Sequence, residues 1–367
     1  MPRTMASGSH PQYRCSLIEG VEKVEDYRPG GFCPIIIGQI LEEKYEIIAK
    51  LGYGGHSTVW LARSVTTDNI WVAIKVLKSD KSEQGNSELA IHRSIRQANI
   101  IQYLDDFWIQ SPNGFHLCLV MEVTGPSIYL YVESLWNGKL DVETAIDLSR
   151  QCVKALIALH NLGYAHGDVC SANFAVGLSD ISHFVDKSMD YYTGYQTGAV
   201  WSEANSPLPA GVPERLYESV PSLMNVDLSS VKMIDFGEAF SGMKKGVATH
   251  ASYRAPELLA DEEATVQSDI WSMGCLIFEL MTSQSLFVGN LTTVAGEQLT
   301  FFARPPKQRY EYLIELLSEH SVLEYEEEND WLANLLSDML VQDRQGRMNL
   351  GLVLEHDFFK FAGQIGE

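Results

Sequence analysis

The sequence is poor in basic residues relative to acidic ones. Lys and Arg number 27 against 48 Asp and Glu, so the formal net charge is −21. This balance argues against nucleic acid and anionic membrane surfaces as direct partners and mildly favours basic partners. A charged surface that only keeps the protein in solution is the plainer alternative.

Paired cysteines and long hydrophobic runs are also missing. The six cysteines are scattered and include no Cys-x-x-Cys pair, which argues against a zinc site or a disulfide framework and fits a reducing compartment. No run reaches about 18 apolar residues, the length of a membrane span, and the first residues contain no apolar signal core. We therefore expect a soluble, intracellular protein with no membrane partner. We further expect it to be a monomer of the cytoplasm and/or nucleus.

The 367 residues change character from strand-rich to helix-rich. Short β-branched and apolar runs separated by turns predict an antiparallel sheet, and one helical pattern at 86–96 interrupts them. Apolar spacing over 140–162 predicts a long helix that begins at the N-cap Asp141 and ends at Gly163. The other expected elements are strands at 45–50, 58–63, 70–77, 103–110 and 116–122 and helices at 268–282, 308–317 and 331–340.

These patterns predict an α+β fold with two lobes, because the chain is too long for one small core. The expected parts are an N-terminal extension at 1–44, a β-rich lobe with its connecting hinge at 45–124, a helical lobe at 125–361 and a tail at 362–367. A loop-rich insertion at 178–228 belongs to the helical lobe in this division.

Glycines between the first two strands form a candidate phosphate-binding turn. Residues 51–59 read Leu-Gly-Tyr-Gly-Gly-His-Ser-Thr-Val, and glycine lets a backbone approach a phosphate closely. The pattern alone is weak, because an ordinary hairpin turn has the same composition. The segment opens no helix and lacks Gly-Lys-Ser/Thr, which disfavours a dinucleotide-binding turn and a Walker loop.

Lys75 closes the apolar strand segment Val-Ala-Ile-Lys at 72–75. An ammonium buried there without an anionic partner is costly, although an exposed edge-strand lysine is the common alternative. Glu88, at the start of the predicted helix, is a suitable partner.

Two acidic motifs follow the long helix. Residues 166–173 read His-Gly-Asp-Val-Cys-Ser-Ala-Asn, so that Asp168 and Asn173 are five positions apart. This spacing lets one carboxylate face an attacking hydroxyl while the amide oxygen binds a metal ion. At 233–237, Met-Ile-Asp-Phe-Gly, an apolar strand delivers Asp235 to a turn, where its carboxylate suits Mg²⁺.

Three more motifs complete an ordered series. They are Tyr-Arg-Ala-Pro-Glu at 253–257, Ser-Asp-Ile-Trp-Ser-Met-Gly-Cys at 268–275 and Asp-Arg-Gln-Gly-Arg at 343–347. Together the seven motifs resemble the protein kinase superfamily from Tyr45 to about Phe361. The resemblance implies a two-lobed protein kinase fold with a small antiparallel β N-lobe plus one helix and a larger, mainly helical C-lobe.

The resemblance also implies roles for individual residues. Asp168, Lys75 and Asn173 would be catalytic, Lys75 paired with Glu88 would hold the phosphates of ATP, and Asn173 and Asp235 would bind Mg²⁺. The implied nucleotide-binding set is Leu51, Gly52, Tyr53, Gly54, Gly55, His56, Ser57, Thr58, Val59, Ala73, Lys75, Glu88, Met121, Glu122, Thr124 and Ala175.

Within this set, Met121 matches the gatekeeper and 122–124 the hinge that pairs with adenine. Ala73 and Ala175 would sandwich the adenine ring, with plain core packing as the alternative reading of both. Outside the set, Glu257 and Arg347 look like a buried ion pair. Asp269 looks like the helix aspartate that braces the catalytic loop, which is the segment 166–173.

A closer resemblance is to the SR-protein kinases, particularly their fungal relatives. It is carried by residues 25–31, by 45–52 together with 57–62, and by 234–240, and the insertion with Pro-Glu-Arg-Leu-Tyr at 213–217 also looks like theirs. The resemblance implies a protein substrate, of basic Arg/Ser-rich type, for this acidic chain.

Two departures from the kinase pattern bear on activity. Gly167 replaces the arginine that receives an activation-loop phosphate, and the activation segment 235–257 has only 23 residues, so we expect no requirement for phosphorylation there. Cys170 replaces the lysine that steadies the γ-phosphate, and the partner threonine is displaced to Thr249, with His250 in its place.

The loss of that lysine predicts a slow serine/threonine kinase, because one missing charge contact costs about 10²–10³ in rate. The alternative is a pseudokinase that binds nucleotide or partners, acting as a scaffold through the insertion. A kinase fold that acts on a small molecule is a third reading, disfavoured by the motif at 253–257.

Overall fold

The computed structural model describes residues 13–16, 18–66, 70–179, 181, 197–203, 206–220 and 226–362. The start of the expected N-terminal extension, parts of the insertion and residues 363–367 of the expected tail lie outside the described residues. The chain forms two compact units. The first comprises Met1–Leu89, Tyr103–Val123 and Asp180–Asn225, and the second comprises Ala90–Gln102, Thr124–Ser179 and Val226–Glu367.

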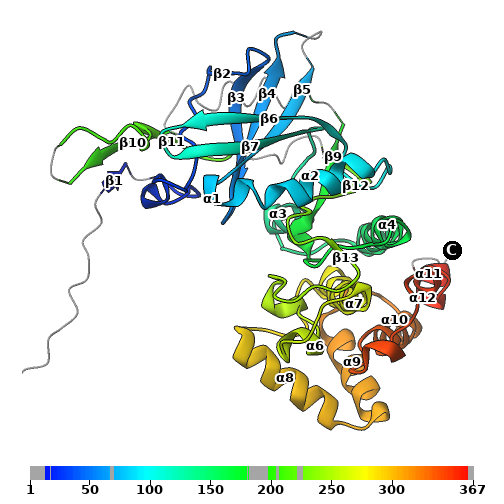
Figure 1. The fold of residues 1–367 in the computed structure, drawn as a ribbon. Helices are drawn as coiled ribbons and strands as arrows, with labels where there is room; N and C mark the ends of the chain where they lie inside the picture. Colours follow the sequence, from blue (N-terminus) through cyan, green and yellow to red (C-terminus); the bar gives the residue numbers. More distant parts are fainter. Residues whose placement is uncertain are drawn as a thin grey trace, which may run out of the picture. The chain divides into compact units, whose positions relative to one another are not determined.

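The first unit is built on a six-stranded antiparallel sheet (Figure 1). In spatial order its strands are β2 (Ile40–Leu41), β3 (Tyr45–Tyr53), β4 (Ser57–Ser64), β5 (Trp71–Leu77), β7 (Gly114–Met121) and β6 (Tyr103–Ser111). Every strand predicted from the β-branched runs is present, within a few residues of its expected ends. Helices α1 (Ser79–Ser82) and α2 (Gly85–Ser94) follow β5, and α2 covers most of the predicted helix.

Residues 197–203 and 206–220, most of the described insertion, pack with the first unit, where the sequence placed them with the helical lobe, whereas 178–179 and 226–228 belong to the second unit. Strands β10 (Thr197–Ser202) and β11 (Arg215–Tyr217) pair with each other, and β10 also pairs with β1 (Tyr13–Cys15) of the N-terminal extension. The 3-10 helix η1 (Val24–Asp26) belongs to the same extension. We call residues 13–35 and 197–220, in their described parts, the accessory subdomain.

Burial of apolar side chains explains why the extension and the insertion associate. Val200, Val212 and Leu216 of the insertion form one buried cluster with Tyr27 and Phe32 of the extension. Neither segment has enough apolar residues for a core of its own, so each covers the other. A separate C-lobe insertion would have left these side chains in water.

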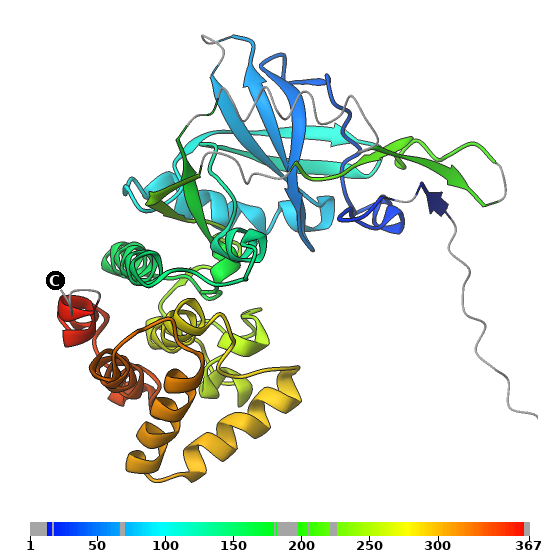
Figure 2. The ribbon, with the colours of Figure 1, turned by 180° about the vertical axis from the view of Figure 1, so that it is seen from behind.

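The second unit is mainly helical (Figure 2). Its helices are α3 (Ile128–Ser134), α4 (Val142–Asn161), α6 (Pro256–Leu259), α7 (Val266–Thr282), α8 (Leu291–Ala303), α9 (Pro306–His320), α10 (Glu326–Met339), α11 (Leu350–Val353) and α12 (Asp357–Phe361). Its short strands and 3-10 helices are β8 (Tyr164–Ala165), η2 (Ser171–Asn173), β9 (Phe174–Leu178), β12 (Val226–Met233), β13 (Phe240–Ser241), η3 (Ala251–Tyr253) and η4 (Arg344–Gly346).

Local signals account for the ends of α4. Asp141 Oδ1 accepts a hydrogen bond from the Thr144 amide at 2.9 Å, as expected of an N-cap, and Gly163 stops the helix with φ of +83°. The predicted helices at 268–282, 308–317 and 331–340 correspond to α7, α9 and α10. Helix α8 was not predicted.

No helix of the described residues has both the length and the hydropathy that crossing a membrane requires.

Candidate active site

In the first unit, Lys75 and Glu88 form a buried ion pair. Lys75 Nζ lies 2.7 Å from Glu88 Oε1, and the two side chains are 10% and 4% exposed. Strand β5 carries the lysine between apolar neighbours, and the first turn of α2 carries the glutamate. The expected contact is therefore present, and its role toward a phosphate remains a prediction.

The glycine-rich segment forms the β3–β4 hairpin. Gly52 pairs with Val59 and Tyr53 with Thr58, and the Gly54 amide donates to the Ser57 carbonyl at 2.9 Å. Gly55 and His56 lie at the tip of this hairpin. A Cβ placed on Gly52, Gly54 or Gly55 would meet no atom within 4 Å, and none of the three has a positive φ. The chain's own packing thus does not require these glycines, which fits a backbone kept open for a ligand.

The residues expected around adenine are distributed over both units. In the first, Ala73 of β5 pairs with Met121 of β7, both are buried, and Glu122 follows at the end of the strand. In the second, Thr124 precedes α3, and Ala175 is buried in β9. A shared adenine pocket remains a prediction for these five residues.

In the second unit, two antiparallel strands bring the acidic motifs together. Phe174 at the start of β9 pairs with Met233 at the end of β12. Asn173 therefore lies beside the segment that leads into Asp235, and the Ile234 amide donates to the Asn173 carbonyl at 2.9 Å. Pairing of these two strands explains how residues far apart in the sequence reach one site.

Asp168 is held by bonds to both of its carboxylate oxygens. The Asn173 side-chain amide donates to Asp168 Oδ2 at 2.8 Å and to its carbonyl at 2.8 Å, and the His250 amide donates to Oδ1 at 3.2 Å. Burial raises the pKa of the Asp168 carboxyl, and the nearby charge of Asp235 adds to that rise, although His166 and the hydrogen bonds oppose it. A positioned carboxylate with a raised pKa suits a group that accepts a proton.

Asn173 and Asp235 offer oxygen atoms for a cation. Because the amide nitrogen of Asn173 is used by Asp168, its amide oxygen is the atom available for a metal. Asp235 has φ of +59°, a conformation uncommon outside glycine, and the Gly237 amide donates to its Oδ1 at 3.2 Å. Across the described ranges no cluster of three or more His, Cys, Asp or Glu side chains could hold a metal. The amide oxygen of Asn173 and the carboxylate of Asp235 are donors that suit Mg²⁺, which keeps water and takes phosphate oxygens besides one or two protein ligands.

Asp269 at the start of α7 braces the catalytic loop. Its carboxylate accepts hydrogen bonds from the amides of His166 at 2.7 Å and Gly167 at 2.9 Å and lies 2.9 Å from His160 Nε2. His166 Nε2 lies 3.1 Å from the Ile234 carbonyl, so that the loop is also tied to the strand that leads to Asp235.

Glu257 and Arg347 form a bidentate ion pair beneath the end of the activation segment. Arg347 Nη1 and Nη2 donate to the two Glu257 oxygens at 2.8 and 2.7 Å, and Ser268 donates to Glu257 Oε1 at 2.8 Å. Burial alone would raise the pKa of Glu257, but the hydrogen bonds and charge of Arg347 outweigh it and lower that pKa.

A second carboxylate, the partly buried Glu279 of α7, contacts the catalytic loop and was missed from the sequence. Ser171 donates to Glu279 Oε1 at 2.9 Å, and the Tyr253 hydroxyl donates to Oε2. Burial raises the pKa of Glu279. An acidic residue inside the apolar run Ile-Phe-Glu-Leu-Met was the available signal. This network ties the catalytic-loop residue Ser171 to Tyr253 of the Tyr-Arg-Ala-Pro-Glu motif at 253–257.

The two departures from the kinase pattern have distinct structural settings. Gly167 has φ of +78°, and a Cβ there would lie 2.8 Å from the Glu238 carbonyl, so that the backbone requires glycine. Thr249 donates to the Gly167 carbonyl at 2.5 Å, which joins the activation segment to the loop. Cys170 is buried, and burial together with the charge of Asp168 raises the pKa of its thiol. At physiological pH it is therefore a neutral thiol.

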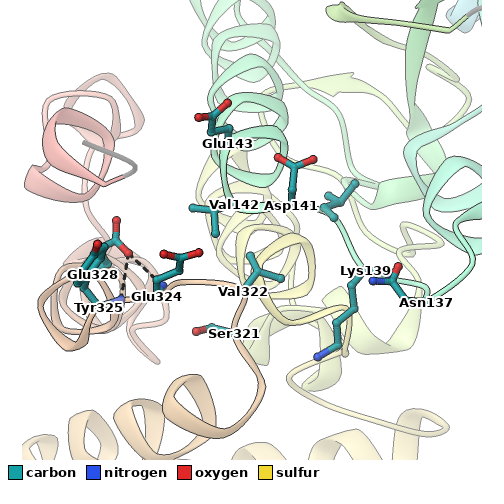
Figure 3. Close-up of a pocket in the computed structure, with 11 residues that line it drawn as sticks. Asn137, Lys139, Asp141, Val142, Glu143, Ser321, Val322, Glu324, Tyr325 and Glu328 are labelled. Carbon is teal, nitrogen blue, oxygen red and sulfur yellow. Dashed lines mark hydrogen bonds between the residues drawn. The ribbon is translucent and has the colours of Figure 1, made fainter. Parts of the chain in front are cut away.

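A cavity of about 600 Å³ elsewhere in the second unit contains none of the predicted site residues (Figure 3). It lies where the start of α4 faces the segment between α9 and α10, and several acidic side chains line it. Two of these acids serve helix starts: Asp141 caps α4, and Glu328 accepts from the amides of Glu324 and Tyr325 at 3.3 Å. The cavity is thus separate from the candidate site.

Comparisons with known proteins point to one family. The protein kinase domain family matches residues 45–182 and 222–359. The serine/threonine-protein kinase SRPK of Physarum polycephalum is 28% identical over 287 residues, which is 72% of this chain and 67% of that protein. The serine/threonine-protein kinase spk-1 of Caenorhabditis elegans is 34% identical over 173 residues, 44% of this chain but only 17% of that protein.

A solved crystal structure of another kinase domain has the same fold. It superimposes with a TM-score of 0.64 at 19% identity and covers 89% of this chain and 98% of that one.

Proposed function

The chain belongs to the protein kinase family and is a serine/threonine kinase similar to the SR-protein kinases, and we propose that it transfers the γ-phosphoryl group of ATP through the residues described above. The observation that carries this proposal is the fixed carboxylate of Asp168, held by Asn173 and by the His250 amide. A group of this kind orients the substrate hydroxyl and accepts its proton while the oxygen attacks the γ-phosphorus and ADP leaves.

The remaining residues position the nucleotide in this proposal. Lys75, fixed by Glu88, holds the α- and β-phosphates, and the glycine-rich turn covers them. Asn173 and Asp235 would hold Mg²⁺, a general requirement of the family, which would neutralise charge on the phosphates.

The substrate we propose is a basic, Arg/Ser-rich protein. Two observations support this class: the net charge of −21 and the resemblance of residues 25–31 and 234–240 to SR-protein kinases. We further propose that the enzyme acts as a monomer in the cytoplasm and/or nucleus. Light scattering on the purified chain and imaging of a fluorescent fusion would check these two points.

The decisive experiment compares the wild type with Asp168→Asn, which keeps the shape of the side chain. With labelled Mg-ATP and a peptide of Arg-Ser repeats, we expect incorporation by the wild type and a loss of at least about 10²-fold in the variant. Asp147→Asn, an exposed change on α4, is the control and should match the wild type. Equal incorporation by wild type and Asp168→Asn would contradict catalysis by this site and favour a scaffold.

Substrate class is tested with paired peptides of equal length. A peptide in which every arginine is replaced by glutamine keeps the serines but loses the positive charge. We expect kcat/KM to fall at least about tenfold, because an exposed charge contact is typically worth up to about 1 kcal/mol and several would be lost together. Equal use of the two peptides would rule out the Arg/Ser-rich class while leaving the kinase activity itself intact.

A further inference from the structure

Lys50 is a completely buried cation in β3, directly before the glycine-rich segment 51–59. Its ammonium forms an ion pair with Glu22, with 0% and 2% of the two side chains exposed, and it donates to the Tyr217 carbonyl at 3.1 Å. Glu22 belongs to the N-terminal extension and Tyr217 to the insertion. One side chain of the β3 strand is thus held by both parts of the accessory subdomain.

The backbone of Lys50 is held as well. The Val220 amide of the insertion donates to the Lys50 carbonyl at 2.9 Å. At this point the β3–β4 register shifts: Lys50 pairs with Trp60 and Gly52 with Val59, which leaves an extra residue in β3. Such a bulge bends the strand and redirects the residues after it, and in β3 those residues form the glycine-rich turn.

The carboxylate of Glu22 is itself fixed. Its Oε2 binds Lys50, and its Oε1 accepts a hydrogen bond from the Tyr27 hydroxyl. A buried ion pair is a poor source of stability, since apolar residues of similar volume often serve as well or better. A contact of this kind instead fixes the positions of the two side chains, because it forms only when both charged groups are correctly placed.

The accessory subdomain has a second anchor on the sheet. Asn113, in the β6–β7 turn, donates through Nδ2 to the carbonyls of Phe32 and Gly211, each at 2.7 Å. A Cβ on Gly211 would lie 2.1 Å from Asn113 Oδ1, so that the insertion approaches this turn as closely as glycine permits. The subdomain is therefore fixed to one edge of the sheet and reaches β3 from there.

We propose that Glu22 is a positioning residue for the nucleotide. Through Lys50 it fixes the bulge that precedes the glycine-rich turn. Because the turn is then partly ordered before the nucleotide binds, it loses less conformational entropy when it closes over the phosphates. The turn has no packing at its glycines that would replace this support. The inference rests on the proposed function, since it concerns the affinity of the same site for ATP.

The test is Glu22→Gln, which keeps the size of the side chain and removes its charge. We expect about tenfold weaker binding of a fluorescent ADP analogue and a similar rise in KM for ATP. The reason is that about one more backbone residue would have to be ordered when the nucleotide binds. The kcat at saturating ATP should stay within about twofold, because the catalytic loop is untouched. The matched control is Glu46→Gln on the same strand, whose pair with Arg63 at 2.6 Å is partly exposed, and it should bind as the wild type does.

A merely structural role for Glu22 predicts a different pattern. Loss of folded protein would lower kcat per total enzyme and leave KM and the analogue affinity of the remaining molecules unchanged, and that result would overturn the proposal. So would equal affinity in a Glu22→Gln variant that melts as the wild type does.

A second variant covers the case in which Glu22→Gln does not fold. Glu22→Leu combined with Lys50→Met fills the same space with apolar groups, and we expect it to fold but to bind the analogue about tenfold more weakly. Wild-type affinity in this variant would overturn the proposal. A wild-type protein that binds no nucleotide at all would instead contradict the proposed function, so the two failures are distinguishable.

Discussion

Removing Arg347 should destabilise the second unit strongly. The Arg347 side chain is 0% exposed and that of Glu257 is 5% exposed, and both Glu257 oxygens accept from the guanidinium. Arg347→Met leaves a buried carboxylate without its partner, which costs about 3–5 kcal/mol. For a unit of this size about 1 kcal/mol shifts the melting midpoint by roughly 2–4 °C, so that we expect a fall of about 10 °C at pH 7.

The pH dependence of this effect follows from the lowered pKa of Glu257. A carboxyl with a lowered pKa in the folded state contributes its full stability above its ordinary value of 4.5, and the contribution is lost as the pH falls through the folded pKa. In Arg347→Met the carboxyl is no longer held ionised and protonates more easily. The difference in melting midpoint between wild type and variant should therefore shrink between pH 7 and pH 4.

Circular dichroism melts of four proteins complete the test. Besides the wild type and Arg347→Met, they are Glu257→Leu and the double variant, which replaces the pair by apolar groups. The double variant should melt above either single variant, because no unpaired charge remains. The reasoning is refuted by a single variant within about 2 °C of the wild type at pH 7, or by a double variant no more stable than the singles.

Three further predictions concern the catalytic loop and the activation segment. Cys170→Lys should raise kcat by about tenfold or more, because a neutral buried thiol supplies no charge to the γ-phosphate; an unchanged kcat would mean that another group already serves it. Gly167→Ala should lower the melting midpoint and kcat together, because its Cβ would lie 2.8 Å from the Glu238 carbonyl at φ of +78°; wild-type values for both would contradict the close approach. Phosphatase treatment should leave activity unchanged, since the loop has no arginine to receive a phosphate; a large gain on phosphorylating residues 238–254 would exclude this.

The parts of the site that were predictable carry local sequence signals. The strand that holds Lys75 and the helix that begins near Glu88 both follow from short periodic patterns, and their pairing follows from the cost of burying a charge. Asp168, Asn173 and Asp235 each stand in a motif of a few residues. The geometry between them rests on the pairing of β9 with β12 and on the hydrogen bonds of Asp168 to Asn173.

The parts that were not predictable depend on contacts between distant segments. Nothing near Lys50 in the sequence indicates that its partner is Glu22 or that Tyr217 accepts from it. The insertion reads as a loop because its strands are short and lie among turn residues, and its place in the first unit emerges only when its apolar side chains meet those of the extension. Glu279 was likewise unassigned, since an acid in an apolar helix has no local partner.

The pairing of the insertion with the N-terminal extension has a consequence for protein synthesis. All strands of the six-stranded sheet have been synthesised once the ribosome reaches Met121, the end of β7. The buried cluster on this sheet, however, also contains Tyr217. At about 5–20 residues per second, the ribosome needs about 5–20 seconds for the roughly 100 residues between them. Until then Lys50 lacks the Tyr217 carbonyl, and apolar residues of the extension lack their contacts with the insertion. The nascent first unit therefore exposes these groups during this interval, and its final closure comes after synthesis of the first part of the other unit.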